Sequence, residues 1–174
     1  MKKFLLFFTI LISIYADDIY FMPFEARPAL KKMLKSIDLS KYKIDIAIYS
    51  FTNHTIAKHL KNAARRGVKI RIIFDKESNL NNRRSELSYL AKYNNIKTFL
   101  ISGKPYRNFE GKGKMHMKLM IIDNKRVIFG SANYSYSAFG KNYEVIYFKN
   151  DYGLAKKGEK FFERMLSKAE EYWL

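Results

Sequence analysis

The chain contains 174 residues and no cysteine, and its 33 lysines and arginines outnumber 16 aspartates and glutamates to give a formal charge of +17. The length suits one domain with a real hydrophobic core, and the lack of cysteine excludes disulfides, thiolate catalysis and zinc sites built from thiolates. Such a positive charge attracts polyanions, so nucleic acid or an anionic lipid surface is an expected partner, although a basic protein can also simply stay soluble.

Residues 1–16 are predicted to be a targeting segment. Two lysines precede a 13-residue apolar run over residues 4–16, which fits a secretory signal peptide, whereas a membrane-spanning helix needs about 20 residues. Cleavage after Ala16 would lower the charge from +17 to +15. Ile14 stands where a small residue is preferred, so an uncleaved anchor that holds the protein at a membrane is the alternative. We expect an exported protein, located in the periplasm, at an outer membrane or outside the cell.

Residues 17–174 are predicted to form one domain of alternating helices and strands. A helix is expected from about Pro28. Residues 43–51 then form a buried strand, residues 53–66 a helix and residues 68–74 a second strand. A strand, a helix and a strand of these lengths indicate a βαβ unit with parallel strands and a right-handed crossover.

The second half is expected to add a helix over residues 82–93, a strand over residues 96–101, a β-hairpin and a strand over residues 143–148. A final helix is expected to run from about Leu154 to Trp173. The whole pattern indicates the α/β class, with a mixed, largely parallel β-sheet flanked by helices on both faces.

Histidines, the remaining metal ligands of interest, are few. His54 and His59 stand five residues apart in a predicted helix, which is off the i, i+4 spacing of a shared metal site. We therefore expect no metal and no other cofactor. The third histidine, His116, lies in the hairpin.

A basic, glycine-rich segment over residues 102–115 precedes the hairpin. Its four cations are predicted to bind substrate phosphates: Lys104, Arg107, Lys112 and Lys114. Tyr106 or Phe109 would lie against a base, so we predict a flexible loop that closes on a nucleic-acid backbone. A solvated surface loop without that role is the alternative.

The hairpin over residues 116–133 holds the main candidate site, because two apolar strands flank a polar turn. If the turn is a two-residue loop, Lys118 lies opposite Ser131. His116 then lies opposite Asn133, and all four side chains project from one face. This patch combines a nucleophile or proton carrier, a fixed positive charge and two neutral hydrogen-bonding groups, which suits a tetrahedral anion.

The motif His116-x-Lys118-x4-Asp123, followed by Gly-Ser131-x-Asn133, resembles the HKD signature of the phospholipase D superfamily. One copy is present, so the chain is most similar to the single-motif bacterial endonucleases of that superfamily, the NucT-type nucleases. The resemblance extends from about residue 21 to the C-terminal helix and implies a phospholipase D-like fold.

The resemblance also implies a mechanism. Family members bring two HKD motifs to one site, so a single motif implies a homodimer in which both copies of His116 meet. One His116 would become phosphohistidine, while the other would act as general acid and then as general base. Lys118, Ser131 and Asn133 would bind the non-bridging oxygens of the phosphate.

Two carboxylates complete the implied site. Glu144 matches the additional carboxylate that the family carries downstream of the motif, and with Asp123 it would orient the histidines or support the local backbone. Side chains alternate along a strand, which places Asp123 on the face opposite His116. A structural role for Asp123 is therefore favoured over direct participation.

Three functions from different classes remain open. The leading one is a metal-independent nuclease that acts on DNA and also on RNA, because nothing in this chemistry requires a 2′-hydroxyl. The second is a lipid phosphodiesterase or phosphatidyltransferase with the same site. The third is a nucleic-acid-binding protein without catalysis, against which the intact motif argues.

Overall fold

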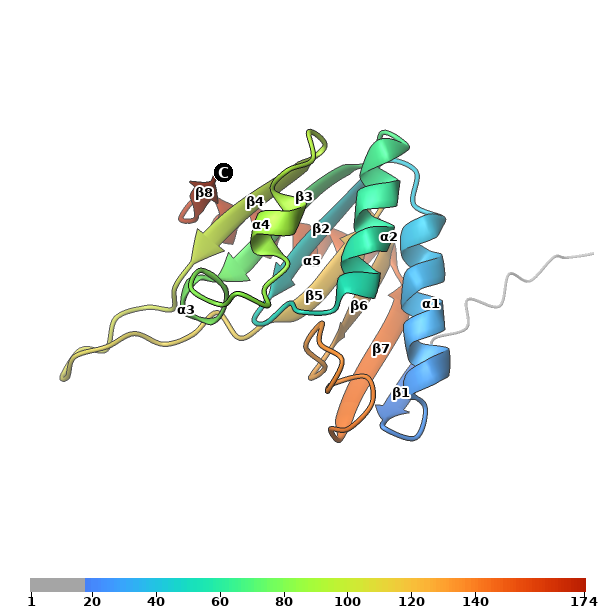
Figure 1. The fold of residues 1–174 in the computed structure, drawn as a ribbon, viewed down its shortest axis with the longest axis horizontal. Coiled ribbons are helices and arrows are strands. Elements are labelled where there is room, and N and C mark those ends of the chain that lie inside the picture. The colour runs from blue at the N-terminus through green and yellow to red at the C-terminus, as the bar shows by residue number, and fades with distance from the viewer. Residues whose placement is uncertain (1–17) are drawn as a thin grey trace, which may run out of the picture.

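The computed structural model describes residues 18–174, which form a mixed eight-stranded sheet with helices on both faces (Figure 1). The strands are β1 (Asp18–Met22), β2 (Lys43–Ile48), β3 (Lys69–Asp75), β4 (Ile96–Ile101), β5 (Lys118–Ile122), β6 (Arg126–Gly130), β7 (Glu144–Asn150) and β8 (Glu170–Tyr172). The helices are α1 (Ala26–Asp38), α2 (His54–Arg65), α3 (Lys76–Asn79), α4 (Leu87–Leu90) and α5 (Tyr152–Leu166). The targeting segment predicted for residues 1–16 lies outside the described residues.

The sheet is largely antiparallel, so the prediction of a largely parallel sheet was wrong. Its strand order is β1-β7-β6-β5-β2-β3-β4-β8. β2, β3 and β4 run parallel, as the predicted βαβ unit requires, and every other neighbouring pair in the described sheet is antiparallel. Tight turns such as the one between β5 and β6 can only reverse the chain, whereas hydrophobic periodicity does not report strand direction.

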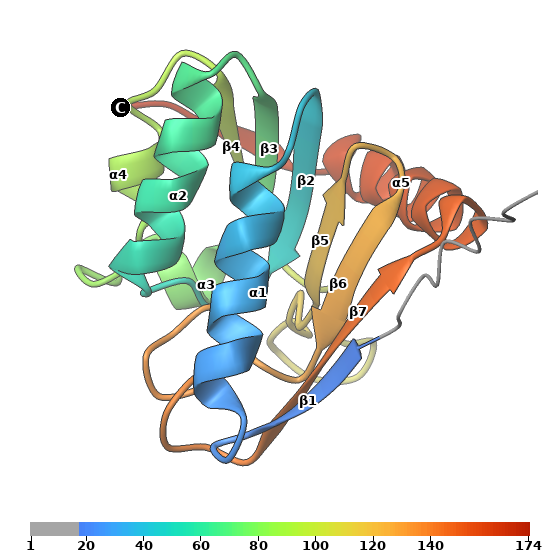
Figure 2. The same ribbon diagram turned by 90° about the vertical axis from the view of Figure 1, so that its right-hand side faces the viewer.

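Two hydrophobic clusters fill the two sides of this sheet. α1 and α2 lie side by side on one face, and α5 covers the other (Figures 1 and 2). Side-chain alternation along β2 supplies both clusters, because Ile46 and Ile48 pack toward α1 and α2 while Ala47 packs toward Phe162 of α5. Each fully buried Ile or Phe contributes roughly 1.5–3 kcal/mol to stability.

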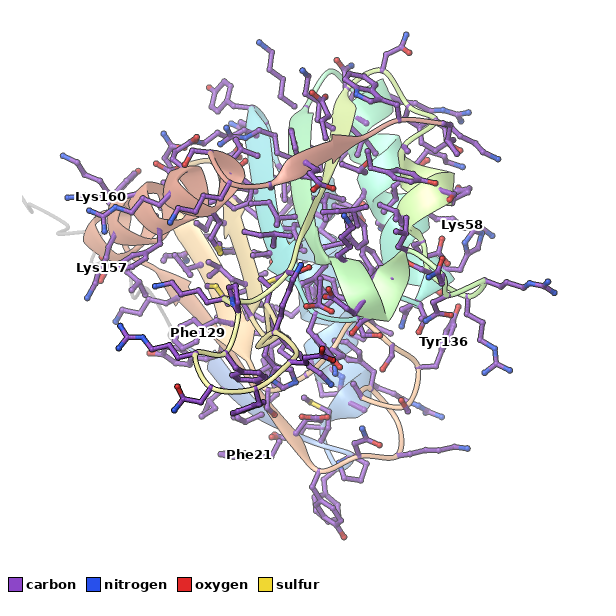
Figure 3. The ribbon with its side chains drawn as sticks, turned by 90° about the vertical axis from the view of Figure 1, so that its left-hand side faces the viewer. Phe21, Lys58, Phe129, Tyr136, Lys157 and Lys160 are labelled. Carbon is purple, nitrogen blue, oxygen red and sulfur yellow. The ribbon has the colours of Figure 1, made fainter. Side chains whose placement is uncertain are left out.

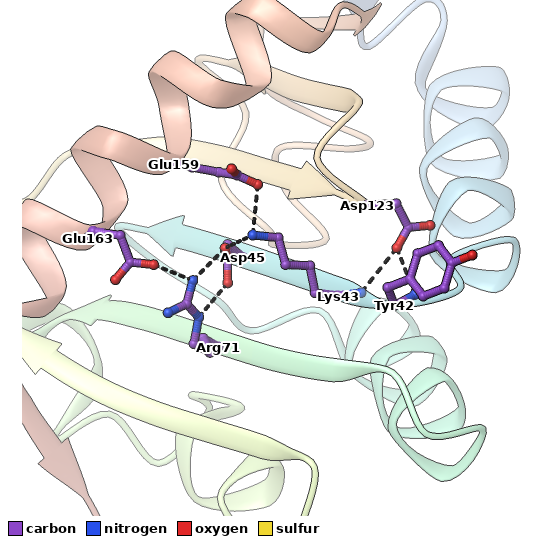
Figure 4. A network of polar contacts seen from close by, with 7 residues as sticks. All are labelled: Tyr42, Lys43, Asp45, Arg71, Asp123, Glu159 and Glu163. Carbon is purple, nitrogen blue, oxygen red and sulfur yellow. Dashed lines mark hydrogen bonds and ion pairs between the residues drawn. The ribbon is translucent and has the colours of Figure 1, made fainter.

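An ion-pair network ties α5 to the sheet (Figure 4). Asp45 of β2 is only 1% exposed, and Arg71 of β3 donates two hydrogen bonds of 2.7 Å to its carboxylate. Arg71 also donates to Glu163 of α5 at 2.7 Å, and Lys43 lies 2.8 Å from Glu159. The hydrogen bonds that Arg71 donates to Asp45 are the main cause of the raised pKa of Arg71. α5 is therefore anchored by charge as well as by apolar packing.

Two predicted helices are shorter than expected. The final helix ends at Leu166 instead of continuing to Trp173, because residues 170–172 leave as β8 and pair with the edge of β4. The helix expected over residues 82–93 is reduced to the single turn α4. In both cases contacts with distant strands outweigh a local apolar pattern.

Candidate active site

Five of the predicted site residues gather at one end of the sheet. His116 and Lys118 stand at the start of β5, Ser131 and Asn133 follow the end of β6, and Glu144 opens β7. Because β5, β6 and β7 are antiparallel neighbours, the start of β5, the end of β6 and the start of β7 lie at the same end of the sheet. The carboxyl end of β2 joins them, since Ile48 pairs with Lys118.

The register of the hairpin differs by one residue from the prediction. Ile122 pairs with Arg126 across a three-residue turn, so Lys118 is level with Gly130 and not with Ser131. Asp123 and Asn124 adopt positive φ angles of 52° and 56°, which Asp and Asn tolerate better than most residues. Direct cross-strand pairing therefore does not align Lys118 with Ser131 or His116 with Asn133, and these residues share only the same end of the sheet.

His116 and Lys118 form the centre of the site. The ammonium Nζ of Lys118 lies 3.0 Å from Nδ1 of His116, 3.2 Å from Nε2 and 2.9 Å from the His116 carbonyl oxygen. An ammonium has only donors, so the ring nitrogen that bonds to it must be unprotonated. The imidazole is exposed while Lys118 is buried. Burial lowers the pKa of Lys118, and the charge of Glu144 partly offsets this.

Ser131 and Glu144 form a second pair. The hydroxyl of Ser131 donates to a Glu144 carboxylate oxygen at 2.5 Å and accepts the backbone N–H of Val145 at 3.1 Å. Asn142 donates to the other carboxylate oxygen at 3.2 Å. In this arrangement the Ser131 proton is directed at Glu144, so Ser131 would have to rotate its hydroxyl before it could donate to a phosphate.

Asn133 is placed at the site by the chain on either side of it. The next residue, Tyr134, donates its N–H to the Ser50 carbonyl and accepts from the N–H groups of Thr52 and Asn53, so this segment is bound to the loop after β2. Oδ1 of Asn133 is buried and has no hydrogen-bond partner within residues 18–174. A buried unpaired acceptor is uncommon and marks a place where a ligand group or water would be stabilised.

Tyr49 is a site residue that sequence reasoning missed. Its ring centroid lies 4.4 Å from that of His116, and Nζ of Lys118 lies 5.2 Å from the same ring. Lys114 donates to its hydroxyl at 3.2 Å, and hydrogen bonds to Ser78 and Lys114 lower the pKa of Tyr49. The available signal was its position, because a polar residue that ends a central strand points to the edge where α/β sites form.

Asp123 lies at the opposite end of β5. Its carboxylate accepts the backbone N–H groups of Lys41, Tyr42 and Lys43 at 2.8–3.1 Å, as Figure 4 shows for two of them. Five strand residues at about 3.3 Å each separate it from the His116 end by roughly 16 Å. The carboxylate therefore holds the turn against the loop before β2 and cannot touch a group bound at His116.

The basic segment over residues 102–115 forms an arm whose two sides are joined by backbone hydrogen bonds. Backbone bonds between Gly103 and Gly113, Lys104 and Gly113, and Tyr106 and Gly111 pair its two sides. A Cβ at Gly103 would lie 2.1 Å from the Gly113 carbonyl carbon, so this approach requires glycine. The arm projects from the body in Figure 1. Lys114 reaches the site through Tyr49, whereas Lys104, Arg107 and Lys112 lie farther along the arm.

The other histidines are engaged elsewhere. Nδ1 of His54 lies 3.1 Å from Glu86, and Nδ1 of His59 lies 2.7 Å from Asp38. In the part of the chain that the structure describes, no three His, Asp or Glu side chains gather as metal ligands would. The same residues include no helix long and apolar enough to cross a membrane.

Fold and site together define an α/β protein with a histidine–lysine site at one end of the strands of a mixed sheet. A family model described as "Cardiolipin synthase, PLD-like domain" matches residues 33–166, and the chain belongs to this phospholipase D-like family. The family predicted from the HKD motif is thereby confirmed.

Solved structures support the same assignment. NucT from Helicobacter pylori is 39% identical, with a TM-score of 0.88 over 90% of this chain and 99% of that one. Nuc from Salmonella typhimurium, described as a phospholipase D family member, is 29% identical, with a TM-score of 0.76 over 91% of this chain and 99% of that one. The predicted phospholipase D-like fold is therefore confirmed.

Longer relatives are also similar. An uncharacterized protein of Helicobacter pylori is 33% identical over 156 residues, which are 78% of this chain and 31% of the relative. The mitochondrial cardiolipin hydrolase of Drosophila melanogaster is 32% identical over 154 residues, 77% of this chain and 57% of the hydrolase. The chain thus spans less than two thirds of these relatives.

Proposed function

We propose that the chain is a phosphodiesterase that hydrolyses DNA, and also RNA, without a metal ion. The observation that carries this is the contact between an exposed imidazole and a buried ammonium, His116 and Lys118, at an edge that also holds Asn133 and the Ser131–Glu144 pair. The resemblance to NucT-type nucleases and the surplus of cations favour nucleic acid as the substrate.

The chemistry follows from these groups. A ring nitrogen of His116 attacks phosphorus, an N–P bond forms, and the P–O bond to the leaving strand breaks. A second imidazolium gives its proton to the leaving oxygen, then takes a proton from the water that attacks phosphorus and breaks the N–P bond. Lys118 and the Asn133 amide offset the charge that develops on the phosphate oxygens. Glu144 keeps Ser131 in place and favours the charged form of Lys118.

One imidazole cannot be nucleophile and acid in the same step, so a second His116 is needed. His54 and His59 face carboxylates elsewhere. We therefore propose a two-fold homodimer whose axis passes beside His116. Apolar side chains exposed around this edge support it: Phe21, Phe24, Met117, Phe129 and Tyr143. Phe21 and Phe129 lie on the part of the sheet that α5 leaves open (Figure 3).

Residues 1–16 are proposed to direct export, with membrane attachment if they are retained.

A lipid phosphodiesterase is the second candidate. It is favoured by the description of the family model and by the similarity to a cardiolipin hydrolase.

The purified protein should be assayed in EDTA with a labelled oligonucleotide and, separately, with vesicles of cardiolipin or phosphatidylcholine. Cleavage of the oligonucleotide that disappears in His116→Ala supports the nuclease. Turnover of lipid alone would establish the second candidate, and binding without turnover would leave a nucleic-acid-binding protein.

A further inference from the structure

A basic groove of about 700 Å³ lies between the base of the arm and the C-terminal end of α5. Its floor is apolar and includes Leu100, Met115 and Met165. Its cations come from three separate parts of the chain: Lys76, Lys104, Lys112, Arg164 and Lys168. The combination of an apolar floor with a cationic rim suits a ligand that carries both flat apolar groups and anionic groups.

Most of this positive charge is not neutralised by the protein. Lys76 pairs with Glu170 at 2.7 Å. The other four cations form no ion pair with any residue from 18 to 174. The guanidinium of Arg164 instead lies 5.6 Å from the ring centroid of Phe161, which is 49% exposed at the groove. Lys112 also acts on the carboxylates of Glu77 and Glu170, whose pKa values it helps to lower. The remaining cations, beside the exposed ring of Phe161, would attract phosphates and a base.

The groove adjoins the candidate active site. Met115 lines its floor, and the next residue is His116. The backbone N–H of Met115 is held by the Asp75 carboxylate at 2.9 Å, which fixes this junction. Lys114, one residue earlier, bonds to Tyr49, whose ring contacts His116. A strand that leaves His116 over Tyr49 and Lys114 would therefore enter the groove at Lys112.

We propose that the groove is a second subsite for the substrate, which binds the part of a single strand beyond the scissile bond. This rests on the proposed nuclease function. Phosphates lie against the arm and the end of α5, and a base stacks on Phe161. A duplex could not stack a base there, because the faces of its bases are already stacked on one another. The volume is that of a small-ligand site, so it accommodates one or two nucleotides.

The test compares two pairs of substitutions on the same helix. Arg164→Ala/Lys168→Ala removes two groove cations, and Lys157→Ala/Lys160→Ala removes two exposed lysines that do not line the groove (Figure 3). Both pairs are made in wild type and in His116→Ala. Binding of a labelled 20-nucleotide single strand to the inactive forms is measured by anisotropy over a range of salt concentrations. Cleavage of that strand and of bis(p-nitrophenyl) phosphate is measured in the active forms.

The groove pair is expected to weaken binding at least tenfold more than the control pair and to lower the slope of log K against log salt by about 1.4, since each phosphate contact on a single strand contributes about 0.7. Phe161→Leu should weaken binding to the strand while keeping the salt slope. The small diester should be cleaved equally well by all the forms that retain His116.

Equal losses from the two pairs, or none from the groove pair, would overturn the subsite. A loss of small-diester cleavage in the groove pair alone would also overturn it, because the substitutions would then act on the site itself. Failure of the proposed function looks different: wild type would not cleave the strand, whereas the comparison of binding constants would still decide whether the groove holds it.

Discussion

Lys118 presents its ammonium to both ring nitrogens of His116, at 3.0 and 3.2 Å, from a buried position at the start of the same strand. The two residues differ in what surrounds them, because the imidazole is exposed and the lysine is not. The exposed ring can move toward a substrate while the charge beside it stays in place. The first predictions concern this pair.

His116→Ala is expected to abolish hydrolysis of an oligonucleotide in EDTA and to leave its binding nearly unchanged. The side chain supplies the proposed nucleophile, whereas binding depends on many cations. His59→Ala is the matched control, since His59 faces Asp38 on the surface. Complete inhibition of wild type by EDTA, with recovery on adding a divalent ion, would contradict the metal-independent chemistry.

Lys118→Ala or Asn133→Ala should lower turnover at least about 100-fold, because each removes a fixed group that stabilises the transition-state phosphate. The dissociation constant for nucleic acid should change much less. Single-turnover rates and binding constants for each variant check this. Turnover close to that of wild type in either variant would show that the side chain does not face the reacting phosphate.

The pH dependence should report the coupling between Lys118 and Glu144. Burial lowers the pKa of Lys118, so the ammonium loses its proton at a lower pH than an exposed lysine does, and activity should fall as pH rises through that lowered value. Glu144 opposes the shift, so Glu144→Gln should move the alkaline loss of activity to still lower pH. Glu171→Gln, on β8, is the control. Superimposable alkaline limbs in wild type and Glu144→Gln would show that the two charges are uncoupled.

Asp123→Ala should destabilise the fold by about 1–3 kcal/mol and leave turnover intact at temperatures well below the melting point. The change removes the acceptor of three backbone N–H groups and places Ala at a φ of 52°. Asp123→Asn keeps the tolerance for positive φ and should lose less. Urea unfolding and activity at 20 °C separate the two effects, and a large loss of turnover in the folded Ala variant would assign Asp123 to the chemistry after all.

Mixing wild type with excess His116→Ala tests the shared site. If each site needs two His116 side chains, random exchange with a ninefold excess should reduce activity per wild-type subunit to about one tenth, because most wild-type subunits then have an inactive partner. Light scattering should give the mass of a dimer. Constant activity per wild-type subunit together with a monomer mass would rule out the shared site.

The sequence predicted the family and the candidate residues, but not how the strands around them are arranged. The hairpin, the βαβ unit and the HKD spacing depend on local patterns, so the existence of the hairpin over residues 116–133 could be predicted from the chain alone. The register slipped by one because the turn is set by Asp123, whose carboxylate binds backbone that lies about 80 residues earlier in the chain. The antiparallel pairing of β2 with β5 was not predictable for the same reason, since it depends on which strand lies next to β2.

The two outermost strands are the first and last of the described chain, β1 and β8. Seven inter-strand spacings of about 4.8 Å place these edges roughly 34 Å apart. A tether attached before Asp18, whether the native segment or an engineered linker, would hold the molecule by the β1 edge. The groove borders β4 and β8, at the far edge, and would stand away from the attachment surface. Immobilisation through the N-terminus should therefore leave long substrates access to it, whereas a bulky fusion after Leu174 would crowd it.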